Sequence, residues 1–199
     1  MVQEIQSALE VLRKGGVILY PTDTVWGIGC DATDPEAVAK VYEIKKRADS
    51  KSLVVLAGDM DMVCRYVREV PDMALQLVEL NDKPMTIIYP GAVAGEKGNM
   101  KATRHCLAFN VVADDGSVGI RVPLGGFCQE LASRFGRPIV STSANISGCP
   151  SPGNFSEIPE EIKSAVDHVV DPSLGKGATG KASSIIKLGL DYSVEIIRK

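Results

Sequence analysis

The sequence predicts an α/β protein with a twisted mixed sheet flanked by helices. Segments with the periodicity of amphipathic helices are interspersed with short aliphatic segments along all 199 residues, which is typical of this class. At 45% hydrophobic and 24% charged residues, the chain has enough apolar mass for one sizeable core. It contains no internal repeat and no Pro/Ser-rich linker. We therefore expect residues 1–199 to form a single domain.

The first elements follow from their apolar patterns and their end signals. A helix is expected at residues 3–13, and the glycines at 15–16 would stop it. Its inward stripe comprises Ile5, Ala8, Leu9 and Leu12. The aliphatic segment 17–20 predicts a buried strand that ends at a proline. A second helix begins after Asp34, whose side chain would cap it while Pro35 occupies its first position.

The remaining elements follow from the same two patterns. Short aliphatic or alternating segments bounded by turn residues predict strands, and longer segments with helical periodicity predict helices. The strands are expected at residues 53–56, 85–89, 107–112, 118–122, 138–141, 168–170, 184–188 and 194–198. The helices are expected at residues 60–68, 71–80, 126–135 and 159–166.

Composition and charge exclude several classes of protein. The N-terminus has no signal-peptide pattern, and no stretch approaches the length of an apolar membrane span, so neither secretion nor a membrane location is expected. Five cysteines, an odd number without a C-x-x-C pair, favour a reducing, cytoplasmic location over disulfides or a zinc site. The net charge of −3 argues against a protein that coats itself with nucleic acid. An anionic ligand would therefore need a local patch of basic residues.

Two polar segments follow the first strand and the second helix. Residues 21–29 (PTDTVWGIG) place hydroxyls, a carboxylate and glycines at a strand end, where open α/β sheets bind ligands. They are equally compatible with a tight turn capped by Asp23 and Thr24. Lys45 and Arg47 follow the helix, where cations complement the helix dipole. On an extended segment these two side chains would project to one side and grip a polyphosphate.

Two further segments place polar groups within or directly after strands. Arg121 is centred in an apolar strand, and Ser117 would face the same way. Either Arg121 pairs with a buried carboxylate, or it binds a substrate carboxylate or carbamate. Further on, an aliphatic strand runs into a row of hydroxyls and an amide. In extended geometry Ser141, Ser143 and Asn145 share one face, which suits ribose, phosphate or an amino acid, although a surface Ser/Thr loop is the alternative.

One segment imitates a phosphate-binding loop. Residues 175–182 (GKGATGKA) nearly match G-x-x-x-x-G-K-S/T, but Ala182 replaces the hydroxyl that binds magnesium. The next segment predicts a strand, whereas such a loop requires a helix whose N-terminus meets the phosphates. We therefore expect no P-loop. The two histidines, His105 and His168, lie in no catalytic or metal-binding motif, so we expect neither a Ser-His-Asp triad nor a metal held by protein side chains.

Taken together, the motifs resemble those of the YrdC family, the threonylcarbamoyl-AMP synthases. In sequence order they are PTDTVWGIG at 21–29, IKKR at 44–47, KPMT at 83–86, SVGIRVP at 117–123, STSANISG at 141–148, SSIIKL at 183–188 and IIR at 196–198. The resemblance implies a YrdC-like fold with a concave, positively charged cleft. It also implies that L-threonine, bicarbonate and ATP, which carries Mg²⁺, give threonylcarbamoyl-AMP and pyrophosphate, as the first step in modifying adenosine 37 of tRNA.

The resemblance also implies which residues form the site. The family's L-threonine contacts fall on Thr22, Arg121, Ser141 and Ser183. Its ATP contacts fall on Lys45, Arg47, Asp49, Ser117, Ser143, Asn145, Ser151 and Arg198. Lys45 and Arg47 would also act in catalysis. No histidine base is needed, because transfer at phosphorus depends mainly on positioning and charge neutralisation.

Two departures from the family pattern concern threonine recognition. Leu56 stands where many relatives have a histidine that approaches the amino acid, and residues 82–86 keep only Pro84 and Thr86 of a P-G-x-x-T pattern. The expected partner is an enzyme complex that passes the threonylcarbamoyl group to tRNA, with direct contact to tRNA or double-stranded RNA as a further option. Two alternative functions remain open: an RNA-binding factor in translation or ribosome maturation, which the acidic composition disfavours, and a carbamoyl-adenylate activity resembling that of HypF.

Overall fold

The computed structural model describes residues 1–47 and 52–199. Its helices are α1 (Val2–Arg13), α2 (Pro35–Ile44), α3 (Met60–Tyr66), α4 (Asp72–Leu80), α5 (Gly126–Phe135) and α6 (Glu160–Ala165). Its strands are β1 (Ile18–Tyr20), β2 (Gly27–Gly29), β3 (Val55–Leu56), β4 (Met85–Tyr89), β5 (Val118–Arg121), β6 (Ile139–Val140), β7 (Thr142–Ser143), β8 (His168–Val169), β9 (Ser184–Leu188) and β10 (Val194–Arg198). The predicted α/β class is confirmed.

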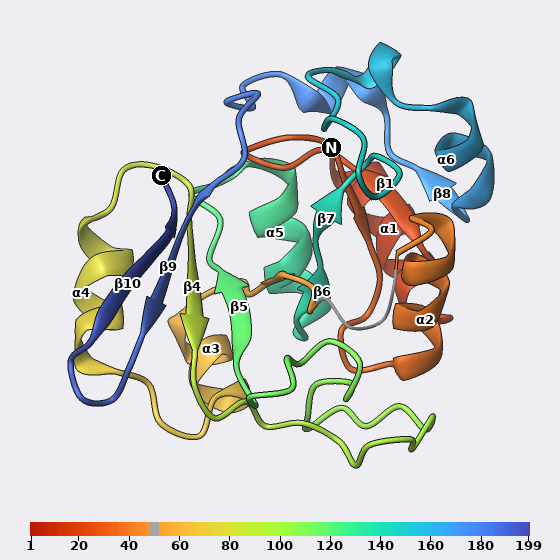
Figure 1. Cartoon of the computed structure of the whole chain (residues 1–199). Helices are drawn as coiled ribbons and strands as arrows, with labels where there is room; N and C mark the ends of the chain where they lie inside the picture. The colour runs from red at the N-terminus through yellow and green to blue at the C-terminus, as the bar shows by residue number, and fades with distance from the viewer. Residues whose placement is uncertain (48–51) are drawn as a thin grey trace.

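The strands form two mixed sheets rather than the single central sheet that the sequence predicted (Figure 1). The order is β7-β2-β1-β8 in the smaller sheet and β10-β9-β4-β5-β3-β6 in the larger sheet. The chain passes from the larger to the smaller sheet at Ser141, between β6 and β7. There the Ser141 N–H donates to the Val54 carbonyl at 2.8 Å. A residue predicted for the site therefore lies where the two sheets are joined.

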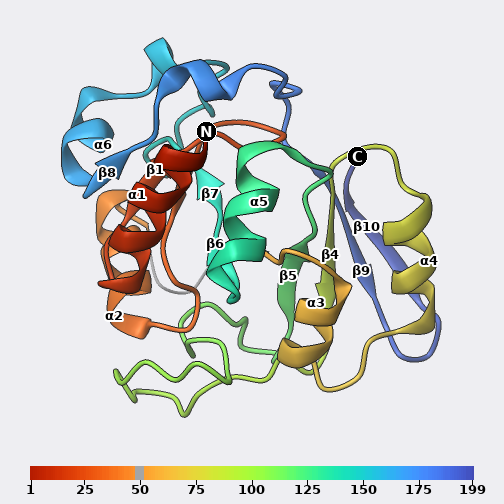
Figure 2. The same ribbon diagram turned by 180° about the vertical axis from the view of Figure 1, so that it is seen from behind.

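Helices cover the rear of the sheets. Seen from behind, α1 and α5 lie side by side, and α3 and α4 lie on the near side of the larger sheet (Figure 2). The predicted stripe of α1 is buried and packs with Phe127 and Leu131 of α5, which confirms the prediction. Full burial of each large aliphatic side chain contributes about 1.5–3 kcal/mol. None of the helices formed by residues 1–47 and 52–199 combines the length and hydrophobicity that crossing a bilayer requires.

The N-terminus of α2 follows the predicted capping pattern. The Asp34 carboxylate accepts hydrogen bonds from the Glu36 N–H at 3.0 Å and the Ala37 N–H at 3.3 Å, and Pro35 begins the helix. Such a cap typically stabilises a helix by about 1 kcal/mol. The cap fixes the start of α2, and Lys45 follows the last residue of this helix. The cap therefore helps to set the position of Lys45.

Two strands of the smaller sheet were not predicted. β2 has the sequence Gly-Ile-Gly, in which glycine, a residue depleted in strands, stands on both sides of the isoleucine, and β7 lies within the hydroxyl-rich segment. Gly29 is required by close packing, because a Cβ there would lie 2.5 Å from the Val140 carbonyl oxygen. Glycine therefore permits this strand at a position where local propensity disfavours it.

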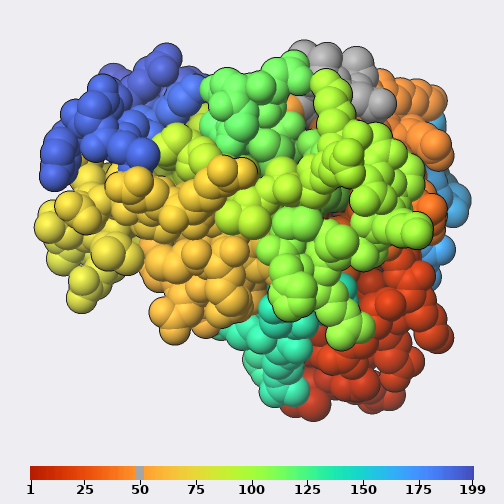
Figure 3. All heavy atoms as spheres, turned by 90° about the horizontal axis from the view of Figure 1, so that it is seen from below, coloured from red at the N-terminus to blue at the C-terminus, as the bar shows by residue number. Residues whose placement is uncertain are grey.

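Segment 91–116 crosses the lower face of the molecule, where Figure 3 shows it spread between α3 and α1. The predicted strand at 107–112 within it is wrong. Only Leu107 makes an isolated bridge, and the Val111 N–H donates to the Ala108 carbonyl at 3.0 Å in a reverse turn. Leu107, Ala108 and Val111 are nevertheless buried in the main core. The apolar pattern thus indicated that these residues are buried. It did not indicate an extended backbone, because residues in a turn can be buried as well.

Candidate active site

A cavity of about 360 Å³ opens where the two sheets meet. One wall is formed by the β1–β2 loop, β2 and β7, and the other by β4, β5, β9 and β10. Its size is that of a small-molecule site, and its lining combines hydroxyl and guanidinium groups with aliphatic side chains. Within the described part of the chain, no aspartate or glutamate lines it. This lining suits an anionic or zwitterionic ligand, while a positive potential across the whole cleft stays a prediction.

Most residues predicted for the site line this cavity. They are Thr22, Arg47, Ser117, Arg121, Ser141, Ser143, Ser151, Ser183 and Arg198. Lys45 and Asn145 line an adjoining hollow of about 210 Å³, which shares Arg47 and Ser143 with the cavity. Asp49 lies outside the described residues. The fold therefore brings together side chains from both ends of the sequence, and their roles in binding stay predictions.

Arg121 satisfies both interpretations that the sequence left open. It is buried at the end of β5, where it forms an ion pair with the Asp23 carboxylate of the β1–β2 loop. It also lines the cavity. Burial lowers the pKa of the guanidinium from its usual value, and an adjacent carboxylate favours the charged form. Arg121 is thus held by a protein carboxylate while it remains accessible to a ligand.

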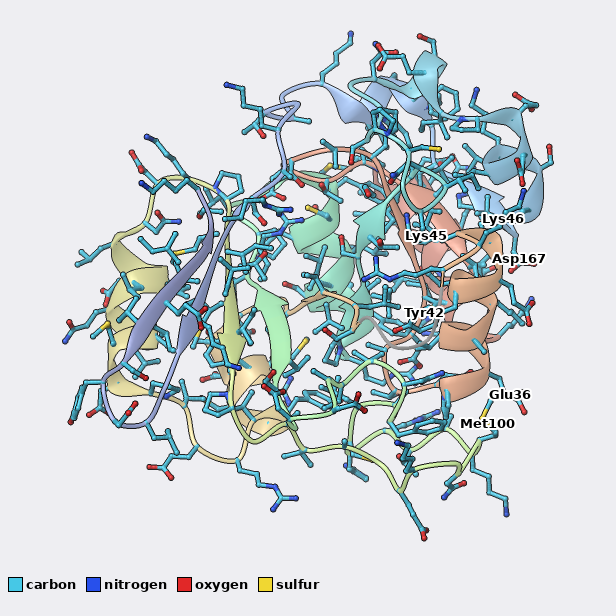
Figure 4. The ribbon with its side chains drawn as sticks, viewed as in Figure 1. Glu36, Tyr42, Lys45, Lys46, Met100 and Asp167 are labelled. Atoms are coloured by element: carbon cyan, nitrogen blue, oxygen red, sulfur yellow. The ribbon has the colours of Figure 1, made fainter. Side chains whose placement is uncertain are left out.

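Lys45 lies on the inner side of the α2 C-terminus, whereas Lys46 points outward (Figure 4). Its Nζ donates to the carbonyl oxygens of Ser143 at 2.5 Å and Asn145 at 2.7 Å, and it lies 3.3 Å from the Asn145 side-chain oxygen. Burial, together with the smaller effect of the nearby Arg47 charge, lowers the pKa of Lys45 to about 8. The lysine therefore joins the end of α2 to the end of β7 and to the segment that follows it.

Lys45 and Arg47 do not lie on an extended segment, so the condition under which they would project to one side is not met. α2 ends in a tight turn in which the Arg47 N–H donates to the Tyr42 carbonyl at 3.0 Å, and Lys46 takes a φ of 50°. The turn forms because the last carbonyls of a helix need hydrogen-bond donors. Arg47 instead reaches the cavity separately, and its guanidinium donates to the Ser52 carbonyl at 3.0 Å.

The hydroxyl-rich segment departs from simple alternation. Ser141 and Ser143 line the cavity as expected, but Thr142 lines it too, and Ala144 enters the core. The Asn145 N–H donates to the Ser143 carbonyl at 2.9 Å, which ends the extended geometry. The Ser143 hydroxyl then donates to the Asn145 side-chain oxygen at 2.5 Å. Asn145 is thereby turned into the adjoining hollow rather than toward the main cavity.

Thr86 and Thr24 line the cavity although they were not among the predicted site residues. The Thr86 hydroxyl lies 2.8 Å from the Ser183 hydroxyl, and Thr24 is hydrogen-bonded to Thr22 at 2.8 Å. Each of these two threonines is thus hydrogen-bonded to a residue that was predicted for the site. Thr86 stands in the KPMT motif, and that position on β4 was the signal available in the sequence.

Neither Leu56 nor most of the glycine-rich segment 175–182 lines the cavity. Leu56 is fully buried in the same hydrophobic cluster as Tyr20, and Val54, two residues earlier in the chain, lines the cavity. The strand β9 begins at Ser184 after the glycine-rich segment, so the rejection of a P-loop is confirmed. Within that segment only Ala182 lines the cavity.

A family model described as "Telomere recombination" (Sua5_yciO_yrdC) matches residues 10–199. The chain belongs to the Sua5/YciO/YrdC family. Among curated members, the threonylcarbamoyl-AMP synthase of Photobacterium profundum is 28% identical and is aligned over 100% of both chains. That of Dichelobacter nodosus is 30% identical over 98% of this chain and 94% of its own. The resemblance inferred from the motifs is therefore confirmed.

Solved structures of the Sua5/YciO/YrdC family share the fold. Sua5 of P. abyssi, solved in complex with L-threonine, has a TM-score of 0.75 and 25% identity over 92% of this chain, which spans only 50% of that protein. Full-length HypF in a phosphate- and nucleotide-bound form has a TM-score of 0.78 and 25% identity over 98% of this chain, which spans 28% of HypF. YciO of E. coli, with a TM-score of 0.75 and 24% identity, shows the fold alone.

Proposed function

We propose that this chain is a threonylcarbamoyl-AMP synthase, which uses L-threonine, bicarbonate and ATP and releases pyrophosphate. The observation that carries the proposal is the single cavity between the two sheets, because the family's motifs, far apart in sequence, contribute side chains to it. The names of the aligned relatives support the same activity. Residues 1–199 would act as one domain in the cytoplasm.

L-Threonine would bind at the Arg121 end of the cavity. The guanidinium suits a carboxylate, because it offers several N–H donors in a fixed plane. Thr22, Ser141 and Ser183 line the same cavity and would accept or donate the remaining hydrogen bonds of the amino acid. The L-threonine complex of the P. abyssi Sua5 supports this assignment of the ligand.

ATP would extend from the cavity into the adjoining hollow. Arg47 and Arg198 supply charge, and Ser117, Ser143 and Ser151 supply hydroxyls along the lining. Lys45 and Asn145 would complete the phosphate site from the hollow, and Asp49 remains part of the proposal. The lining formed by residues 1–47 and 52–199 offers hydroxyls and cations, which are a poor ligand set for magnesium, so Mg²⁺ would be held mainly by the ATP phosphates.

The residues of the cavity would act by positioning and neutralisation. The threonine amine adds to the bicarbonate carbon, water leaves, and a carbamate results. A carbamate oxygen then attacks the α-phosphorus of ATP, and the bond to the pyrophosphate oxygen breaks. The arginines that line the cavity would offset the negative charge that gathers on the phosphoryl oxygens. The product would pass to an enzyme complex that modifies tRNA. No described contact favours the RNA-binding alternative over this enzyme.

Pyrophosphate release tests the proposed reaction. Protein mixed with ATP, Mg²⁺, bicarbonate and L-threonine should release pyrophosphate, and omission of threonine should abolish the release. Carbamoyl phosphate supplied in place of threonine and bicarbonate tests the carbamoyl-adenylate alternative. Release that ignores threonine, or that requires carbamoyl phosphate, would contradict the proposal.

The lowered pKa of Lys45 predicts a pH dependence of ATP binding. Its ammonium group is protonated below its pKa of about 8 and loses its charge as the pH rises above that value. ATP affinity should therefore fall severalfold between about pH 7 and about pH 9, a range in which the phosphates of ATP are already ionised. Calorimetry with ATP and no threonine avoids titration of the amino acid. The same titration of Lys45→Met should show a lower affinity that changes little with pH.

A further inference from the structure

The Asp23–Arg121 pair joins the two walls of the cavity. Asp23 lies in the β1–β2 loop of the smaller sheet, and Arg121 lies at the end of β5 in the larger sheet. Their side chains are 12% and 4% exposed, so water screens the pair little. Arg121 lines the cavity, but Asp23 does not. The carboxylate therefore acts on the cavity through the arginine rather than through direct contact with a ligand.

Asp23 is itself fixed from several directions. One carboxylate oxygen accepts a hydrogen bond from an Arg121 Nη and lies 3.9 Å from the Cys128 sulfur, and the other accepts from the Leu124 N–H at 3.4 Å. Burial raises the pKa of Cys128 to about 11, so the thiol stays neutral beside the carboxylate. The Asp23 backbone carbonyl accepts from the Thr179 N–H at 3.0 Å. The loop that carries Asp23 is thus tied to the segment that leads to Ser183.

Without Asp23, the Arg121 guanidinium could take several orientations. Arginine has several rotatable bonds, and each orientation presents a different edge of its planar group. Asp23 accepts a hydrogen bond from one nitrogen of the Arg121 guanidinium. The other N–H donors of Arg121 are not used by Asp23, and Arg121 lines the cavity. A guanidinium held in this way is ready for a second carboxylate, without the loss of side-chain entropy that binding usually requires.

We propose that Asp23 is a positioning residue for threonine binding, which holds the Arg121 guanidinium across the junction of the sheets so that its remaining donors receive the substrate carboxylate. This inference rests on the proposed function. It assigns Asp23 no contact with threonine or ATP. Its loss should therefore weaken binding of the amino acid and leave binding of the nucleotide largely unchanged.

A second buried pair in the same protein supplies a matched control. Asp31 and Arg137 also form an ion pair between distant segments, with side chains that are 4% and 17% exposed. Neither residue lines the cavity or the adjoining hollow. Asp31→Asn therefore removes a comparable carboxylate charge without reaching the proposed site.

The test compares Asp23→Asn with Asp31→Asn in the full chain. The half-saturating threonine concentration of Asp23→Asn should rise by about tenfold or more, while that for ATP stays within about twofold of wild type. In Asp31→Asn both values should stay within about twofold. If Asp23 acts through Arg121, Asp23→Asn should add little on an Arg121→Lys background, as a double-mutant cycle would measure.

Three results would overturn the inference: an unchanged threonine value in Asp23→Asn, an equal loss for ATP, or the same threonine loss in Asp31→Asn. If Asp23→Asn does not fold, Asp23→Glu gives the same comparison, because it keeps the charge but displaces the guanidinium; threonine binding should then be weakened selectively. A wild-type protein that binds no threonine would instead refute the proposed function. Wild-type activity with a neutral effect of Asp23→Asn refutes only the positioning role.

Discussion

Replacing Arg121 with alanine should abolish detectable L-threonine binding while preserving most of the ATP affinity. Arg121 is the buried cation that lines the cavity at the end of β5 and pairs with Asp23. Its removal would deprive the threonine carboxylate of this guanidinium. Loss of such a charged partner typically lowers the binding affinity by two to three orders of magnitude, which corresponds to about 3–4 kcal/mol. Isothermal calorimetry with each ligand separately measures the two affinities.

This substitution also leaves the Asp23 carboxylate buried without its cation. We expect the free energy of unfolding to fall by about 3–5 kcal/mol for that reason. The double variant Asp23→Ala/Arg121→Ala removes both charges and should recover part of that stability without recovering threonine binding. Threonine binding that survives in either variant would contradict the assignment of Arg121 to the substrate carboxylate.

Lys45→Met should lower both stability and ATP affinity. Its Nζ donates to the backbone oxygens of Ser143 and Asn145. Without it the Ser143 carbonyl keeps the Asn145 N–H as a donor, but the Asn145 carbonyl loses the Lys45 donor. A buried acceptor without a donor costs about 1–3 kcal/mol before relaxation, so we expect the free energy of unfolding to fall by about 1–3 kcal/mol. The segment 143–145 would then shift, and ATP affinity should fall by more than about tenfold. Urea unfolding and ATP calorimetry measure the two effects.

Lys40 provides the control on the same helix. Its Nζ donates to the single Gly15 carbonyl at 2.9 Å on an exposed surface, so Lys40→Met should change the free energy of unfolding by less than about 1 kcal/mol. Its ATP affinity should match that of wild type. Equal effects of Lys40→Met and Lys45→Met would show that general loss of charge on α2, and not the contacts of Lys45, accounts for the result.

Elements with strong local signals were predicted closely. α5 occurs at the expected residues 126–135 and ends at Gly136, which takes the left-handed conformation with a φ of 72°. β4 likewise occurs at the expected residues 85–89. In both cases the periodicity and the ends agree with the tertiary environment. Segment 107–112 failed because an apolar sequence is compatible with any buried backbone, including the turn observed there.

The site was located from the sequence by its motifs, but its geometry was not. The cavity contains residues from most of the predicted motifs, yet Thr86 and Thr24 were missed and Lys45 lies in the adjoining hollow. The extended geometry that would have aligned Lys45 with Arg47 does not occur, because the end of α2 needs hydrogen-bond donors and the chain forms a turn there. The partner of Arg121 was left open, because nothing in the apolar strand identifies a carboxylate 98 residues away.

By itself, the sequence determined the α/β class, the positions of most helices and the residue types available for a carboxylate and a polyphosphate. Hydrophobic periodicity, caps and glycines act over a few residues, so they can be read without a partner segment. Only the tertiary structure decided that there are two sheets, that Asp23 holds Arg121, and that Lys45 binds the backbone of a segment 100 residues away. Each of these depends on which distant segments pack together, because strand pairing and buried charge pairs are chosen by the free energy of the whole core.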